Sequence, residues 1–174
     1  MDVAIVKNKS EFIAFSLFPV GVIGWGKSKK EAIDSISDNI YDYCNWLYRP
    51  LPKSADAVVV EEYCGEVSSL KFKSDDKSLA KKYAEVVVQT AFSFKCMLDS
   101  FELSESEKEL ASGVYTKLNI AGGGVIGYAS DLSETGDLPK CRAFIYNVYK
   151  VAKEIFFLAT ERGVTPTDCF KFDI

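Results

Sequence analysis

The spacing of apolar residues changes from a strand-like to a helix-like period along the first third of the chain. Alternating or valine-rich runs predict four strands, at residues 2–6, 11–18, 21–26 and 56–64. After the third run, apolar residues recur every three or four positions from Ile33 to Leu47, which predicts a helix closed by Pro50 and Pro52. These residues therefore predict a β-β-β-α-β module.

The later apolar positions follow a helical period and predict a helical bundle. The expected helices cover about residues 76–101, 104–118, 125–133 and 140–162. The composition changes around KSDDKS, so we place a domain boundary after residue 73. Residues 66–72 are open to two interpretations, extended chain or a short strand, and the tail from residue 164 is expected to be irregular. The predicted fold class is α+β, with the module over residues 1–73 and an all-α bundle over residues 74–174.

Two serines stand where helices are expected to begin. Ser28 precedes Glu31 by three residues, and Ser104 precedes Glu107 by the same spacing. In a capping box the serine hydroxyl accepts the glutamate N–H, and the glutamate carboxylate accepts the serine N–H. We therefore expect a capping box at both places.

Residues 21–28, GVIGWGKS, match the phosphate-binding loop pattern G-x-x-x-x-G-K-[ST]. In that alternative Gly26, Lys27 and Ser28 would bind the phosphate of a nucleotide. Two features favour an edge strand followed by a helix cap. The residues between the glycines are β-favouring, and the hairpin of residues 2–18 predicts an antiparallel neighbour where the loop needs a parallel sheet.

A second glycine pattern, G-x-G-x-x-G, is formed by Gly122, Gly124 and Gly127. In dinucleotide-binding proteins this pattern follows a strand and opens a helix. Here a helical pattern precedes it and no strand follows. We interpret the small residues of this segment as permitting a bend and a close helix contact.

The composition and the charges exclude several classes of function. The chain has no histidine, which removes the commonest metal ligand and the usual general base near neutral pH. Its five cysteines lie far apart and are expected to be reduced thiols. We therefore expect no catalytic, cofactor-binding or metal-binding residues. The net charge of −4, with interleaved signs, does not favour nucleic acid as a partner.

Two features of the chain bear on localisation. No apolar run reaches the roughly 18 residues that a membrane span needs. Met1 leads directly into strand-like residues, without the pattern of a signal peptide. These features predict a cytoplasmic protein.

Gly26, Ser28, Glu31 and Ala32 fit the G-x-T/S-x-x-E-A motif with which the third strand opens the helix in HicB-like domains. Residues 2–64 resemble that family. The resemblance implies a β-β-β-α-β module and a protein partner, because many members are antitoxins that bind a toxin. Full antitoxins usually append a ribbon-helix-helix or helix-turn-helix DNA reader. No basic appendix of that kind is visible in this sequence, and toxin binding is left open.

KLNIAGGGVIGYASDL, residues 117–132, resembles the L-x-H-I-A segment of DinB-like four-helix proteins. The shared residues are Leu118, Ile120 and Ala121. Asn119 stands where that family has a metal-binding histidine, so the resemblance implies a bundle scaffold without its metal site. We also expect a pocket for a small apolar ligand between helices, near Asn119 and Tyr128.

The sequence thus predicts a non-enzymatic binding or regulatory protein. It would act through a protein partner or through self-association as a homodimer, using an open edge strand of the β module. The alternative is a nucleotide-binding protein that uses residues 21–28.

Overall fold

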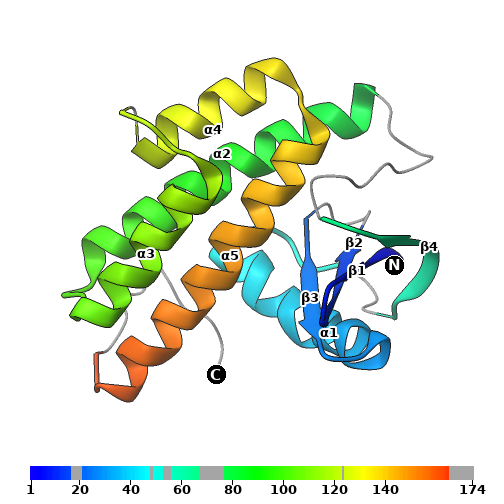
Figure 1. Ribbon diagram of the computed structural model, residues 1–174, viewed down its shortest axis with the longest axis horizontal. Helices are drawn as coiled ribbons and strands as arrows, with labels where there is room; N and C mark the ends of the chain where they lie inside the picture. Colours follow the sequence, from blue (N-terminus) through cyan, green and yellow to red (C-terminus); the bar gives the residue numbers. More distant parts are fainter. Residues whose placement is uncertain (17–20, 48, 53–55, 67–76, 123, 165–174) are drawn as a thin grey trace.

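The computed structural model describes residues 1–16, 21–47, 49–52, 56–66, 77–122 and 124–164 (Figure 1). The strands are β1 Asp2–Asn8, β2 Glu11–Ser16, β3 Ile23–Gly26 and β4 Val58–Cys64. The helices are α1 Lys29–Trp46, α2 Lys77–Ser100, α3 Glu105–Leu118, α4 Gly124–Thr135 and α5 Leu138–Glu161. The predicted α+β fold is confirmed.

Some of the sequence predictions concern residues outside the described ranges. These are the domain boundary after residue 73, the last two residues of the predicted strand 11–18, most of segment 66–72, and the tail from residue 165. Helix α1 ends at Trp46, with Leu47 as its C-cap, ahead of Pro50.

The sheet is mixed, with the strand order β3-β2-β1-β4. β2 pairs antiparallel with both β1 and β3, and β4 lies parallel to β1. Residues 3–6 of β1 are all buried, and because successive side chains point to opposite faces, both faces of the sheet are covered. α1 packs on β2 and β3, while α5 reaches the other face, where the ring of Tyr146 meets Phe15 at 6.3 Å between centroids.

Two glycines of the GVIGWGKS segment let α1 lie close to β3. A Cβ atom on Gly24 would stand 2.2 Å from the carbonyl oxygen of Ala32 and 2.6 Å from the backbone nitrogen of Ile36. A Cβ atom on Gly26 would stand 2.4 Å from the Cβ of Glu31. Contacts this short with backbone atoms exclude any side chain at Gly24, so helix packing alone requires a glycine there.

The two predicted helix caps differ in detail. Ser104 and Glu107 form the complete reciprocal box at the start of α3, as expected. At the start of α1 the Ser28 hydroxyl accepts the N–H of Glu31 at 3.2 Å, which confirms that half of the prediction. The other half is wrong, because the Glu31 carboxylate accepts the N–H of Lys27 at 2.9 Å and the hydroxyl of Ser28, rather than the Ser28 N–H.

Helix α5 joins the bundle to the sheet module through buried aromatic residues. The ring of Tyr149 lies 6.3 Å from Trp25 of β3, and 5.4 Å from both Tyr43 and Trp46 of α1. Tyr43, Trp46 and Tyr149 belong to the buried hydrophobic core, which includes residues of both the sheet and the bundle, and the partly buried Trp25 packs against it. The two parts of the chain therefore share one core.

One part of the glycine interpretation is wrong. A Cβ atom on Gly122, Gly124 or Gly127 would meet nothing within 4 Å, so these residues are not required for close helix contact. Gly124 has a φ of +67°, in the left-handed region that favours glycine, and it stands where the chain turns into α4. The predicted bend is therefore supported.

Candidate functional site

The candidate phosphate-binding residues Gly26, Lys27 and Ser28 form hydrogen bonds of the sheet and of the helix cap. Gly26 pairs with Phe12 in the antiparallel ladder between β2 and β3, and the N–H of Lys27 donates to Glu31. Ser28 caps α1. A phosphate loop instead needs several free N–H groups that converge on an anion behind a parallel strand. The observed arrangement does not supply that geometry.

The outer edge of β3 is covered by side chains of α1. The Ser35 hydroxyl accepts the N–H of Trp25 at 3.4 Å, and the Asn39 amide donates to the carbonyl of Ile23 at 2.7 Å. Asn39 is held in turn by Lys153 of α5, whose Nζ lies 2.5 Å from its Oδ1. Of the two outer strands of the sheet, β3 is therefore the one whose edge groups are partly taken up by side chains of α1.

The two expected pocket residues do not line one pocket. Asn119 is the exposed C-cap of α3, in the left-handed conformation. Tyr128 stacks on Phe144 at 5.9 Å and lines a small hollow of about 270 Å³ to which Asn119 does not contribute. Lys117 and Leu118, the two residues before Asn119, do line this hollow, whereas Asn119 itself is exposed beside it.

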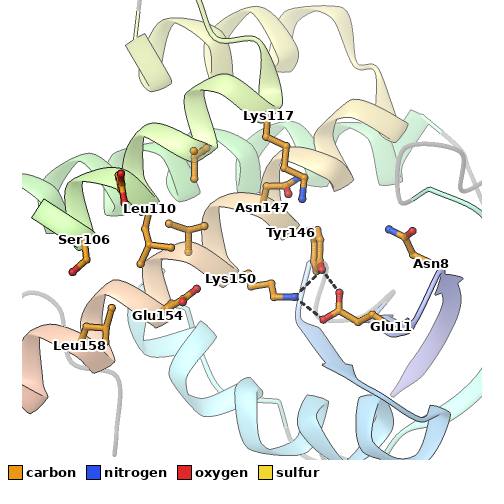
Figure 2. A pocket seen from close by; sticks show the side chains of 14 residues that line it. Asn8, Glu11, Ser106, Leu110, Lys117, Tyr146, Asn147, Lys150, Glu154 and Leu158 are labelled. Atoms are coloured by element: carbon orange, nitrogen blue, oxygen red, sulfur yellow. Dashed lines mark hydrogen bonds and ion pairs between the residues drawn. The ribbon is translucent and has the colours of Figure 1, made fainter.

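A larger hollow is an open groove between α3, α5 and the turn that joins β1 to β2, with a volume of about 800 Å³ (Figure 2). We call it the α3–α5 groove. Its lining residues are Asn8, Glu11, Ser106, Glu109, Leu110, Gly113, Val114, Lys117, Tyr146, Asn147, Lys150, Val151, Glu154 and Leu158. The volume lies within the range of ligand-binding clefts.

The floor of the α3–α5 groove is apolar. Leu110 and Val114 contribute from α3, and Val151 and Leu158 contribute from α5. Gly113 lies between the two α3 residues, and a Cβ atom there would meet nothing within 4 Å. Glycine disfavours a helix interior, and the packing of the described residues does not require it here. The position leaves room in the groove that a larger side chain would fill.

A polar cluster stands beside this floor, where β2 meets α5. The Glu11 carboxylate accepts from the Tyr146 hydroxyl at 2.7 Å and from Lys150 Nζ at 2.6 Å (Figure 2). Lys150 also donates to the Tyr146 oxygen at 3.2 Å and lies 5.4 Å from the centre of the Trp25 ring. The cluster fixes the strand β2 to α5.

The protonation of this cluster follows from its contacts. Burial alone would raise the pKa of the Glu11 carboxyl, but hydrogen bonds from Lys150 and Tyr146 outweigh burial and hold that pKa below its ordinary value. Burial, together with the hydrogen bond to Glu11, raises the pKa of Tyr146 well above its ordinary value. At neutral pH the carboxylate is therefore ionised and the phenol is protonated.

Three charged residues of the groove form no ion pair with any described residue. Glu109 and Glu154 are exposed near the beginning of α3 and the later part of α5. Lys117 is exposed at the opposite end, with its Nζ 5.9 Å from the centre of the Tyr146 ring. One end of the groove is thus acidic and the other is basic.

Sequence reasoning missed this groove, although α3 carries a signal of it. Leu110, Gly113, Val114 and Lys117 follow the spacing of one helix face, with a glycine in the middle of a helix. The lining residues outside α3 come from segments more than 25 residues away in the chain, so no contiguous pattern joins them to α3.

The described residues also bear on three other features: a metal site, a reactive thiol and a membrane span. No group of three histidine, cysteine, aspartate or glutamate side chains there could hold a metal ion. Cys44 and Cys141 are buried, whereas Cys64 and Cys96 are exposed, and all four are free thiols. Burial raises the pKa of Cys141 to about 11, so its thiol is protonated at neutral pH. None of the described helices has the length and apolar character needed to cross a membrane.

Comparison with protein-family models, with curated proteins and with solved structures found no match for this chain. The role of the α3–α5 groove must therefore be inferred from its own geometry.

Proposed function

We propose that this chain is a non-enzymatic, cytoplasmic binding protein and that the α3–α5 groove is its binding site. The observation that carries the proposal is the groove itself, about 800 Å³ in volume, with an apolar floor and oppositely charged ends. Apolar lining with a few placed polar groups is the usual construction of a binding cleft. The HicB-like resemblance of residues 2–64 supports a regulatory role with a protein partner.

The polar cluster supports binding rather than catalysis. Glu11, Tyr146 and Lys150 satisfy one another at 2.6–3.2 Å. A general acid or base works best with a pKa near the operating pH, whereas the pKa of Glu11 is lowered and that of Tyr146 is raised. These groups hold one wall of the groove in place.

The groove can be tested with the dye anilinonaphthalene sulfonate, which combines an apolar body with an anionic group. We expect saturable binding to the unmodified chain, and weaker binding to Gly113→Leu. A leucine at residue 113 would remove on the order of 55 Å² of the apolar surface that the groove and the dye bury against each other. At about 25 cal/mol per Å², this loss corresponds to about a tenfold weaker affinity for the dye.

Gly127→Leu is the matched control. Gly127 is also a helical glycine with no atom within 4 Å of an added Cβ, but it does not line the groove. The Gly127→Leu variant should bind the dye with the same affinity as the unmodified chain. Both variants should keep the far-UV circular dichroism of a folded protein. Equal dye binding by all three proteins would refute the proposed site.

Self-association through β4 is a second candidate. β4 is an outer strand of the sheet, and its Val58 and Val60 are 58% and 46% exposed. Exposed valines on an edge strand favour pairing with another chain. Light scattering across a range of concentrations tests this candidate, and a strict monomer would count against it.

A further inference from the structure

We infer that the α3–α5 groove binds one amphipathic helix of a protein partner, about three turns long, which lies parallel to α3. This inference rests on the proposed function, because it assumes that the groove is the binding site. It goes further by naming the kind of occupant and its direction.

The shape of the groove suits a helix. α3 and α5 run antiparallel, since Glu107 near the start of α3 pairs with Arg162 after α5, while Lys117 near the end of α3 lies over Tyr146. The lining of α3 extends from Ser106 to Lys117, which at 1.5 Å per residue is about 16 Å, or three turns. Two helices side by side form a trough in which a third helix packs by the ordinary rules of helix contact.

The floor of the groove suits the apolar face of that helix. Leu110 and Val114 are one turn apart on α3, with Gly113 between them, and Val151 and Leu158 are two turns apart on α5. A glycine in the wall allows the backbone of a neighbouring helix to come close. Apolar residues at positions i, i+3, i+4 and i+7 of the partner would cover this floor.

The charges of the groove favour one direction of the bound helix. Glu154 lies toward the end with Ser106 and Leu158, and Lys117 lies at the opposite end (Figure 2). Glu109 lies eight residues before Lys117 on α3, in the part of the helix where Ser106 also lines the groove. The N-terminus of a helix carries partial positive charge and its C-terminus partial negative charge.

A bound helix whose N-terminus faces Glu109 and Glu154 therefore places its C-terminus near Lys117. Because Glu109 precedes Lys117 along α3, this helix runs parallel to α3 and antiparallel to α5. The opposite direction would place the negative end of the helix beside two carboxylates. Neither those carboxylates nor Lys117 has an ion-pair partner among the described residues, so all three charges are available to the occupant.

The test uses two designed peptides of about twelve residues, the length of three turns. Both carry leucine at positions i, i+3, i+4 and i+7, blocked termini, a fluorescent label and a lactam bridge that holds the helix. The matched peptide has lysine in its first turn and glutamate in its last turn, and the reversed peptide has these two exchanged. A third peptide of the same composition has its leucines spread around the helix.

Fluorescence anisotropy should show saturable binding of the matched peptide to the unmodified protein. The reversed peptide should bind about fivefold to tenfold more weakly, the effect of favourable against unfavourable charges at helix ends. The spread peptide should not bind. Gly113→Leu should weaken the matched peptide at least about tenfold by filling the groove, whereas Gly127→Leu should not change its affinity.

The triple variant Glu109→Lys, Glu154→Lys, Lys117→Glu should reverse the order of the matched and reversed peptides, because it exchanges the sign of the charge at both ends of the groove. Equal affinity of these two peptides for the unmodified protein would overturn the inferred direction. If no peptide binds while the dye still binds in a manner that depends on Gly113, the groove takes a small ligand and the helix inference is wrong. If neither dye nor peptide binds, the proposed function fails as well.

Discussion

Gly24 shows how one missing side chain decides the packing of the sheet module. Its Cα faces the first turns of α1, and the nearest atoms to an added Cβ are backbone atoms of Ala32 and Ile36. Backbone atoms cannot rotate away as a flexible side chain can, so Gly24→Ala forces β3 and α1 apart. We expect the free energy of unfolding to fall by about 1–3 kcal/mol, measured by urea denaturation.

The control for this residue is Gly127→Ala in α4, where the added methyl group meets no atom. Alanine is favoured over glycine in a helix by about 0.5–1 kcal/mol, so this variant should be slightly more stable than the unmodified chain. If the two variants change stability in the same direction, close approach is not the reason for the glycine at residue 24.

At the scale of the elements, a buried carboxylate ties the start of α3 to the end of α5. The side chain of Glu107 is fully buried, and it accepts from Arg162 Nη2 at 2.6 Å, from Arg162 Nε at 3.0 Å and from the Ser104 N–H at 2.9 Å. Burial would raise the pKa of this carboxyl, but the hydrogen bonds from Arg162 and Ser104 lower it below its ordinary value.

Glu107→Gln should therefore reduce stability at neutral pH by about 1–3 kcal/mol, the effect expected for hydrogen bonds to a charged group. A carboxyl whose pKa is lowered on folding stabilises the fold above its unfolded pKa, about 4.3 for glutamate. This contribution is lost as the pH falls through the lower folded value. Urea denaturation should show a smaller difference between the two proteins at about pH 3 than at neutral pH.

Glu109→Gln is the control for that measurement, because Glu109 is an exposed residue of the same helix without an ion pair. Its stability should stay within about 0.5 kcal/mol of the unmodified chain at both pH values. A deficit of Glu107→Gln that is equal at both pH values would show that its carboxylate charge is not responsible.

The elements themselves could be predicted because their signals are local. Alternation, helical period and the two serine caps lie within a few residues of one another, and the helices begin where Ser28 and Ser104 indicate. The capping-box pattern does not predict that the Glu31 carboxylate accepts the Lys27 N–H rather than the Ser28 N–H, because a carboxylate can reach either of these neighbouring groups, four and three residues before it. Residues 21–28 match both a phosphate motif and a strand-to-cap motif; the β-favouring residues between the glycines favour the second, and the antiparallel pairing with β2 and the Ser28 cap agree with it.

The site could not be predicted, because it exists only at the scale of the whole molecule. Lys150 and Glu11 are 139 residues apart in sequence and meet because α5 crosses the sheet next to β2. The prediction at Asn119 and Tyr128 followed one short stretch of sequence, whereas the groove combines α3, α5 and the first hairpin. Non-local contacts of this kind have no period that a sequence pattern could show.

The shared core makes a prediction about the unfolding of the whole chain. Both tryptophans, Trp25 and Trp46, belong to the β-β-β-α-β module, and both contact Tyr149 of the bundle. Lys153 of α5 adds a salt bridge to Asp42 of α1, with Nζ and Oδ2 2.6 Å apart. Unfolding of either the β-β-β-α-β module or the bundle would therefore expose apolar core residues of the other. Domains that share a core in this way unfold together.

Tryptophan fluorescence reports on the module and far-UV circular dichroism reports mainly on the long helices of the bundle. We expect the two signals to give the same urea midpoint. Tyr149→Ala, which removes the ring at the centre of the contact, should lower both midpoints together by the equivalent of about 3–5 kcal/mol. Two separated transitions in the unmodified chain would instead mean that the module and the bundle are stable independently, and that α5 rests on the sheet without being required by it.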